Sequence, residues 1–308
     1  MLAIFLETLP FFLLIGCGYG ASRAGMFPEA AVGYLTKFVF FFALSAMLFR
    51  FAATLPVSEI IDPWFIAAYL GATMVLYLAT VLVLRLAKHS LEEIAVEAQC
   101  GVIGNVGFLS VPIVIGLFGE AAAGPVLMLL SIDLLIFGSL IVLMITGARG
   151  GRISGEMIAT MGTGLLKNPM VMSIFAGLLW SLASLPLPGP MLNFLEILGA
   201  AATPGALFAI GASLAVRKAE RIEIAAGLSV IKLIIHPAIC AVAAFLVFPV
   251  DPFAAAVMVA TAAAPTAGNV FMLAEHYGVA QQRASSTIFV STVAAVVTMS
   301  VVFGLVLP

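Results

Sequence analysis

Residues 99–119 read Gln-Cys-Gly-Val-Ile-Gly-Asn-Val-Gly-Phe-Leu-Ser-Val-Pro-Ile-Val-Ile-Gly-Leu-Phe-Gly, and the architecture that we expect follows from them. The stretch is apolar and long enough to cross a bilayer, which takes about 20 such residues in a helix. Its middle disfavours a helix, because each glycine near Asn105 costs about 1 kcal/mol relative to alanine and Pro112 lacks a backbone donor. We therefore expect a membrane-spanning helix that is broken at Asn105.

A second broken stretch lies in the other half of the chain. Residues 262–273 read Ala-Ala-Ala-Pro-Thr-Ala-Gly-Asn-Val-Phe-Met-Leu. Backbone at membrane depth leaves the helix only where protein or a water-filled cavity satisfies its polar groups. Two spans interrupted by glycine and proline, one in each half of a chain, are the usual sequence indication of a transporter's binding site.

The composition is that of an integral membrane protein. Hydrophobic residues make up 63% of the chain and charged residues 9%, whereas about 25% of the residues in a soluble domain are charged. This excludes a soluble globular protein, and the net charge of −2 gives no indication of a nucleic-acid partner. Cys17, Cys100 and Cys240 lie in apolar runs without metal-ligand spacing, so we expect no metal and no bound cofactor.

The apolar runs predict an all-α integral membrane protein with ten transmembrane helices, five in each half. Four helices begin with a polar cap: a capping box starts at Ser90, and Asp62, Asn168 and Asp251 each precede a proline at the first helical position. The predicted spans are 2–20, 31–49, 64–84, a fourth running from Ser90 through the broken stretch, 122–145, 169–183, 192–216, 222–248, 252–275 and 285–307.

The odd number of spans in each half determines how the halves are related. The second half enters the membrane from the opposite side, which gives an inverted repeat. A connector rich in glycine and arginine, residues 147–155, divides the chain near its midpoint. We therefore predict a first five-helix repeat over residues 1–150 and a second, inverted repeat over residues 151–308.

Positive charges are distributed unevenly between the two sides of the predicted membrane protein. An excess of Lys and Arg marks the cytoplasmic loops of membrane proteins. Arg50 is the one basic residue expected on the outer side, beside acidic residues such as Glu120, so both termini are predicted to lie outside. The loops on the inner side hold Arg23, Arg85, Lys88, Arg149, Arg152, Lys167, Arg217, Lys218, Arg221 and Arg283.

Several motifs along the chain resemble those of the auxin efflux carrier family, whose relatives include plant PIN proteins and bacterial malonate- and malate-type carriers. The matching segments are 104–112, 167–169, 203–211, 236–237 and 264–271. Two departures concern proline: PIN-like members have one where this chain has Gly104, and usually another in the second helix, where this chain reads Phe42-Ala43-Leu44-Ser45. The long cytosolic loop of many plant members is also absent.

The resemblance implies a ten-helix fold in which helices 4 and 9 are broken and cross. It implies a scaffold built from helices 1, 2, 6 and 7 and a transport core built from helices 3–5 and 8–10. It further implies an anionic organic substrate at the crossing, near Asn105, in a multi-pass protein of the bacterial inner (plasma) membrane. A second copy of the chain, as a homodimer, is a further candidate partner.

We expect the substrate-binding residues to lie at this crossing: Gly104, Asn105, Pro265, Thr266 and Asn269. Half-helix N-termini carry unpaired N–H groups and a positive partial charge that suit an anion. The amides and the threonine hydroxyl offer hydrogen bonds to a carboxylate without the cost of a buried charge. The alternative is that these small and polar residues only pack helices together.

The register between the two broken spans is open from sequence alone. Matching the two Gly-Asn-Val motifs places Asn105 opposite Asn269. Matching the ends of the two helices instead places Asn105 near Ala264 and Pro265.

Three ionisable residues lie deep inside predicted spans and are candidates for an ion or proton pathway: Asp133, Lys232 and His236. Lys232 and His236 are four residues apart, so they share one helix face. The structural alternative is a buried Asp133–Lys232 ion pair, or a lysine that snorkels to the membrane surface.

These features favour a secondary transporter of small organic anions, a mono- or dicarboxylate such as malonate, malate or an auxin-like acid, coupled to H⁺ or Na⁺ or simply facilitated. A sodium-coupled symporter of the bile-acid type is the nearest alternative. An intramembrane enzyme is a remote one, because no His-Glu-x-x-His or Gly-x-Ser-x-Gly motif is present. We do not expect an ATP-driven pump in one chain, because no Walker-type loop is present. A channel or receptor would bind or conduct without accumulating solute.

Overall fold

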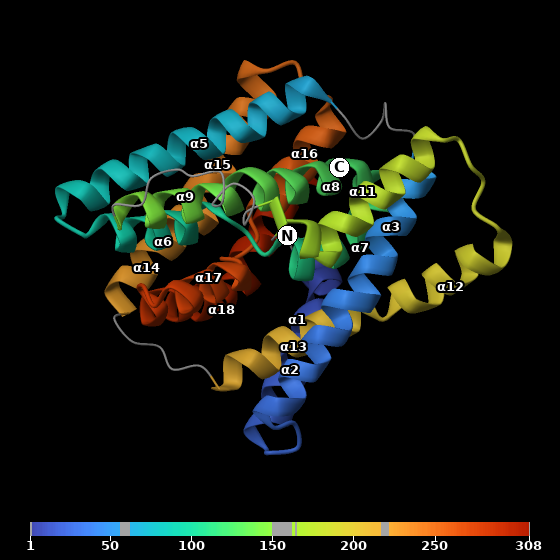
Figure 1. The fold of residues 1–308 in the computed structure, drawn as a ribbon, viewed down its shortest axis with the longest axis horizontal. Coiled ribbons are helices and arrows are strands. Elements are labelled where there is room, and N and C mark those ends of the chain that lie inside the picture. The colour runs from blue at the N-terminus through green and yellow to red at the C-terminus, as the bar shows by residue number, and fades with distance from the viewer. Residues whose placement is uncertain (1, 56–61, 150–161, 164, 217–221, 308) are drawn as a thin grey trace.

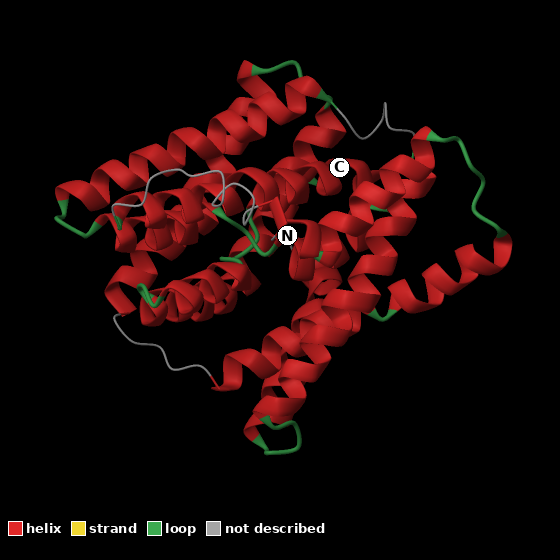
Figure 2. Ribbon diagram, in the orientation of Figure 1, coloured by secondary structure: helices red, strands yellow, loops and turns green. Residues whose placement is uncertain are grey.

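The computed structural model describes residues 2–55, 62–149, 162–163, 165–216 and 222–307. Almost all of these residues are helical (Figures 1 and 2), and no β-strand occurs among them. The first half contains α1 (Leu2–Arg23), α2 (Glu29–Phe38), η1 (Val39–Ala43), α3 (Leu44–Thr54), α5 (Pro63–Leu86), α6 (Leu91–Val102), η2 (Val106–Ser110), α7 (Val111–Phe118), η3 (Glu120–Ala122), α8 (Ala123–Ile132), η4 (Asp133–Phe137) and α9 (Gly138–Ala148).

The second half is built in the same way. It contains α11 (Pro169–Leu182), α12 (Gly189–Ala200), α13 (Ala202–Val216), α14 (Ile222–Val230), η5 (Ile231–Ile235), α15 (His236–Val242), η6 (Ala243–Val247), α16 (Pro252–Ala262), α17 (Gly268–Tyr277) and α18 (Gln281–Val306). The elements η1, η2, η4, η5 and η6 are single π-helical turns, and η3 is a 3₁₀ turn.

Six helices of the described chain are long and apolar enough to cross a membrane. They are Glu29–Thr54, Pro63–Leu86, Glu120–Ala148, Gly189–Ala215, Ile222–Val247 and Gln281–Val306. The predicted all-helical membrane class is therefore confirmed, while the ten-span inverted repeat stays a prediction. The span expected at 192–216 begins earlier, at Gly189, because Pro190 fits the first turn of a helix.

The polar caps predicted from sequence are present. Asp62 accepts hydrogen bonds from the backbone N–H groups at the start of α5, and Asn168 and Asp251 do the same for α11 and α16. Ser90 and Glu93 form both bonds of the capping box that starts α6. Each cap satisfies one or two of the donors that the first turn of a helix leaves free.

Helices α1 and α13 lie side by side (Figure 1), with their backbones in close contact at two glycines. A Cβ atom added at Gly211 would lie 1.8 Å from Ile15 O, and one added at Gly18 would lie 2.0 Å from Phe208 O. At Gly177 in α11, an added Cβ would lie 2.8 Å from Phe49 O of α3. Small residues allow membrane helices to approach this closely, and they fix these two helix pairs.

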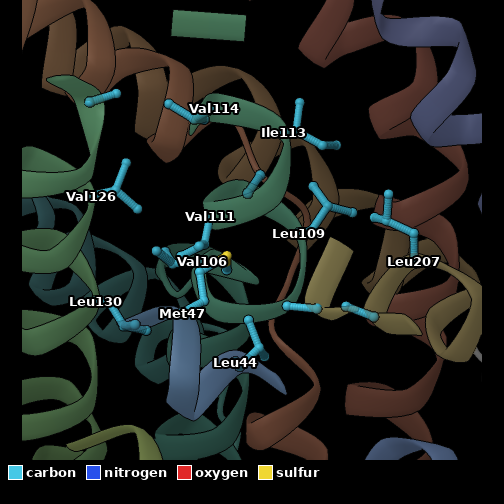
Figure 3. Close-up of a cluster of buried hydrophobic side chains, with 14 of the residues drawn as sticks. Leu44, Met47, Val106, Leu109, Val111, Ile113, Val114, Val126, Leu130 and Leu207 are labelled. Atoms are coloured by element: carbon cyan, nitrogen blue, oxygen red, sulfur yellow. The ribbon is translucent and has the colours of Figure 1, made fainter. Parts of the chain in front are cut away.

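Two clusters of buried hydrophobic side chains form the core. The first surrounds η2 and α7, with side chains from α3, α8 and α13 (Figure 3). The second joins α5, α6, α9, α15 and α17. Helix α16 contributes Val257 and Ala260 to the first cluster and Ala255 and Met258 to the second. The broken span is thus divided between the two cores, with α6 in one and α7 in the other.

We predict that Gly211→Ala lowers the thermal midpoint of unfolding in detergent. The new Cβ would overlap Ile15 O, and overpacking of this kind costs about 1–3 kcal/mol. The matched control is Gly227→Ala in α14, where an added Cβ has no neighbour within 4 Å. That variant should be neutral or slightly stabilised, because alanine favours a helix. Equal midpoints for the two variants would contradict this account of the α1–α13 contact.

Candidate functional site

The two broken spans meet through their backbones. Helix α6 ends at Val102 and α16 ends at Ala262, and the non-helical segments that follow them lie against each other. Gly104 and Thr266 form an antiparallel bridge. The Asn105 N–H donates to Pro265 O at 2.8 Å, and the Ala267 N–H donates to Ile103 O at 3.0 Å. We call residues 103–105 and 263–267 together the paired break.

Asn105 occupies the tightest point of the paired break. Its φ of −76° and ψ of 61° form an inverse γ-turn, closed by a hydrogen bond of 2.8 Å from the Val106 N–H to Gly104 O. Its backbone oxygen accepts from Leu109 and Ser110, while its half-buried side chain caps no N–H group of η2. Among the described residues, the Asn105 amide has no hydrogen-bond partner and is free to bind a ligand.

The half-helices that leave the paired break have no side-chain caps. The residue before η2 is Asn105, whose side chain makes no capping bond, and the residue before α17 is Ala267, which has no polar side chain. Side chains cap α5, α6, α11 and α16, whereas α2, α12 and α18 also begin without a side-chain cap. Free N–H groups and the positive end of a helix dipole therefore lie at the paired break, where they favour an anion.

Thr266 and Pro265 hold the paired break together. Thr266 is fully buried, and its hydroxyl donates to Cys100 O at 2.8 Å. Its N–H donates to the hydroxyl of Ser291 in α18 at 3.1 Å. The Thr266 side chain is thus already bonded within the protein, which leaves the Asn105 amide as the more available of the two for substrate. Ser291 was not singled out from sequence, because a lone serine in an apolar span gives little signal.

Asn105 and Asn269 are not equivalent positions. Asn105 precedes its half-helix, whereas Asn269 is the second residue of α17, and the position equivalent to Asn105 is Ala267. Neither alignment considered from sequence holds along the whole span, because the first half-helix runs from Val106 to Phe118 and the second only from Gly268 to Tyr277. Asn269 Oδ1 is buried without a hydrogen-bond partner among the described residues.

Lys232 is fully buried beside the paired break. Its ammonium donates to Ala262 O at 2.5 Å and to His236 Nδ1 at 3.0 Å. A Cβ added at Gly104 would lie 3.3 Å from Lys232 Nζ. The lysine therefore does not snorkel to the membrane surface, and its shared helix face with His236 is confirmed. The sequence placed Lys232 near mid-membrane but did not place it against Gly104.

Asp133 and His236 belong to the same buried region. His236 Nε2 lies 3.0 Å from the Thr73 hydroxyl, and the Tyr69 hydroxyl donates to Asp133 Oδ1 at 2.8 Å. The Tyr69 and His236 rings are 5.9 Å apart. Asp133 Oδ2 is buried without a partner, and the salt bridges of the described residues do not include an Asp133–Lys232 pair. The structural alternative of an Asp133–Lys232 ion pair is therefore not found among the described residues.

The π-turns η2 and η5 share a sequence signal, a proline soon after the turn. The second residue after η2 is Pro112, and the second residue after η5 is Pro237. Proline cannot donate to the carbonyl four residues earlier, and its ring crowds that carbonyl, so the preceding turn widens. Ser45 holds the same place after η1, and its hydroxyl donates to Phe40 O at 3.0 Å.

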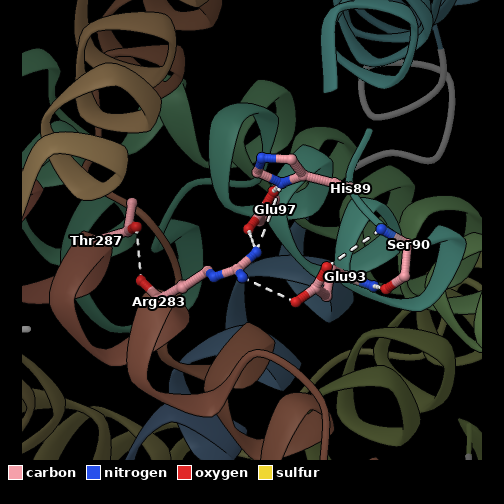
Figure 4. Close-up of polar contacts among 6 residues, drawn as sticks. All are labelled: His89, Ser90, Glu93, Glu97, Arg283 and Thr287. Atoms are coloured by element: carbon pink, nitrogen blue, oxygen red, sulfur yellow. Dashed lines mark hydrogen bonds and ion pairs between the residues drawn. The ribbon is translucent and has the colours of Figure 1, made fainter. Parts of the chain in front are cut away.

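A cluster of charged side chains joins the start of α6 to the start of α18 (Figure 4). Arg283 binds Glu93 at 2.8 Å and also pairs with Glu97, which is fully buried. His89 Nδ1 lies 2.6 Å from the other Glu97 oxygen. Partial burial alone would raise the pKa of the Glu93 carboxyl, but hydrogen bonds from Ser90 and the charge of Arg283 outweigh it and lower that pKa. The sequence pattern does not predict an ion pair for Glu97, because it places Arg283 in a loop on the inner side.

Three other ion pairs, made by two arginines, link elements that are distant in sequence. Arg50 in α3 lies 2.9 Å from Glu120 and 3.5 Å from Glu196 in α12. Arg149 lies 2.8 Å from Glu92 and donates to Tyr277 O at 2.7 Å. The connector at 150–161 and four of the predicted inner charges lie outside the described residues: Arg152, Arg217, Lys218 and Arg221.

The fold and the paired break define a helical membrane protein of the transporter class, and comparison with known proteins agrees. A family model described as membrane transport protein matches residues 3–303. The chain is also 32% identical over 296 residues to a protein of Rhizobium meliloti (strain 1021) named as a putative malonate transporter, covering 95% of this chain and 92% of that one. The chain belongs to this membrane transport family, that of the auxin efflux carriers, as its motifs predict.

We predict that Arg283→Gln destabilises the protein strongly, because it leaves the buried Glu97 carboxylate without its cation. Removing one partner of a buried pair costs about 3–5 kcal/mol. The matched control is Arg149→Gln, whose side chain is 46% exposed and whose ion pair should contribute about 1 kcal/mol or less. Thermal unfolding of both variants in one detergent measures the difference. If Arg283→Gln unfolds at the same temperature as the control, the pairing of Arg283 with Glu97 does not stabilise the fold.

Proposed function

We propose that the protein is a secondary transporter of small organic anions, which bind at the paired break and cross by alternating access. The observation that carries the proposal is the pair of uncapped half-helix starts beside the free Asn105 amide. Backbone hydrogen bonds between the two broken spans hold the starts of η2 and α17 at a fixed separation, and with them their N–H donors. Gly104, Asn105, Pro265, Thr266 and Asn269 form the proposed site, with Asn105 and Asn269 as direct contacts.

We infer a mono- or dicarboxylate as the substrate. Free N–H groups and neutral amides bind a carboxylate through several hydrogen bonds. The relative from Rhizobium meliloti, whose printed name includes malonate, supports a carboxylate of that size. Malonate and malate are accordingly the first compounds to test, and an auxin-like acid is the third.

Alternating access requires one part of the protein to move against another. We propose that residues 1–150 and 151–308 form inverted repeats, with α1–α3 and α11–α13 as the scaffold and the remaining helices as the moving core. The close α1–α13 and α3–α11 contacts support a rigid scaffold. Arg50, in the scaffold, and Glu120, in the core, form an ion pair that this movement would break.

We propose that the protein lies in the bacterial inner membrane with both termini outside. The support is the distribution of basic residues, to which the described Arg23, Arg85 and Arg149 contribute. On this orientation the Arg283 cluster faces the cytoplasm.

The orientation predicts opposite labelling of two exposed positions. In a variant whose three cysteines are replaced by alanine, Met26→Cys should react from the cytoplasmic side and Leu185→Cys from the outside; these side chains are 79% and 52% exposed. A membrane-impermeant maleimide applied to intact cells measures this. Labelling of both cysteines from outside would contradict the proposed topology.

We propose that Asp133, with Lys232 and His236, carries the coupling of transport to an ion. Asp133 has one carboxylate oxygen bonded to Tyr69 and one buried oxygen without a partner. An ionisable group at this depth is a functional candidate by default, because it is costly to keep there.

The proposed contact between Asn105 and the anion predicts weaker binding in Asn105→Ala. A hydrogen bond to a charged group contributes roughly 1.5–3 kcal/mol, so the apparent Kd for the carboxylate should rise about ten- to a hundredfold. Asn269→Ala should have a smaller effect. The matched control is Asn193→Ala, because Asn193 is exposed on α12. Unchanged binding by a folded Asn105→Ala protein would make the paired break a packing feature only.

The proposed coupling role predicts that Asp133→Asn abolishes ion-driven accumulation in proteoliposomes while substrate exchange stays measurable. Asparagine keeps the shape and the bond to Tyr69 but cannot bind and release a proton. Asp251→Asn is the matched control, because asparagine caps a helix as well as aspartate does. Accumulation by Asp133→Asn equal to that of the control would reduce Asp133 to a structural residue.

A further inference from the structure

The position of Lys232 relative to the paired break goes beyond its assignment to an ion pathway. Its ammonium donates a hydrogen bond to the carbonyl oxygen of Ala262, the last residue of α16. The C-terminal end of a helix carries a negative partial charge. In transporters built on broken helices, such half-helix C-terminal carbonyls are where a coupling cation binds. In this protein a covalently attached cation already occupies that carbonyl.

We propose that the Lys232 ammonium is a resident cation of the binding site. It supplies, at the C-terminal end of α16, the positive charge that a bound sodium ion supplies in sodium-coupled carriers. Anion binding at the paired break then requires no sodium. This inference rests on the proposed function, and of the two coupling ions considered, H⁺ and Na⁺, it selects H⁺.

The surroundings of Lys232 fit a cation that stays in place. The side chain is fully buried, so the ammonium cannot exchange its partners for bulk water. Because it donates to His236 Nδ1, the other ring nitrogen carries the hydrogen and donates to the Thr73 hydroxyl. Among the described residues, further titratable groups buried in this region are Tyr69, Cys100, Asp133 and Cys240.

Gly104 explains how the ammonium reaches the paired break. An added Cβ at this position would lie 3.3 Å from both Lys232 Cε and Nζ and 3.4 Å from the Ala264 Cβ. Any larger residue would therefore press on the ammonium. The absence of a side chain at Gly104 brings the positive charge next to Asn105, the proposed ligand of the anion, where a charge interaction with the substrate is strong.

The alternative role for Lys232 is purely structural, as a hydrogen-bond donor that joins η5 to α16. Two substitutions separate the alternatives. Lys232→Gln keeps a neutral N–H donor but removes the charge. Lys232→Ser removes the long side chain and leaves room, and an oxygen, for a metal ion beside Ala262 O. If Lys232 serves only as a hydrogen-bond donor, glutamine should preserve malonate binding. If its charge is required, glutamine should weaken that binding.

The test is malonate binding by the purified full-length protein, measured in sodium chloride and in choline chloride at equal ionic strength. We expect the parent to bind equally in both salts. Lys232→Gln should bind about tenfold more weakly or worse in choline, the size of one close charge interaction. Lys232→Ser should regain affinity in sodium. The matched control is Lys37→Gln, because Lys37 is exposed on α2.

Sodium-dependent binding by the parent would overturn the proposal and needs no variant. Binding by Lys232→Gln equal to the parent would overturn it as well. If the parent binds none of malonate, malate or an auxin-like acid in either salt, the proposed function fails. Thermal unfolding then tests separately whether the Lys232 ammonium takes the place of a sodium ion. Sodium should raise the midpoint of Lys232→Ser and leave that of the parent unchanged, and a parent stabilised by sodium would again contradict the proposal.

Discussion

Backbone groups that leave a helix inside a bilayer find no water to bond, so each needs a partner within the protein. In this chain the two broken spans provide partners for each other. The bonds from Asn105 to Pro265 and from Ala267 to Ile103 satisfy backbone groups of both breaks. The paired break lies where the broken span passes from one hydrophobic core to the other, because α6 belongs to the second core and α7 to the first.

Pairing of the breaks also explains how charge is distributed around the site. The half-helices η2 and α17 start at the paired break without side-chain caps, so their positive ends face it. Two helices also end there: Lys232 donates to Ala262 O at the end of α16, and the Thr266 hydroxyl donates to Cys100 O in the last turn of α6. The proposed site therefore favours an anion without a second bound ion.

Much of this arrangement could be predicted from the sequence, because the relevant signals are local. Glycine, proline and the caps at Asp62, Asn168 and Asp251 fix where helices begin and break, and those predictions are confirmed. Contacts between distant segments left no such signal. The approach of Lys232 to Gly104 and the burial of Glu97 under Arg283 depend on tertiary packing, and the alternative of a direct Asp133–Lys232 pair is not found among the described residues. For the π-turns η2 and η5, the prolines that follow them, Pro112 and Pro237, are a local sequence signal.

The most direct measurement of the central claim is a structure of the protein with malonate bound, determined at a resolution that separates a carboxylate from water. The account predicts density for the anion at the paired break, within hydrogen-bond distance of the Asn105 amide and of the first N–H groups of α17. Malonate bound elsewhere, with the Asn105 amide still without a partner, would contradict it.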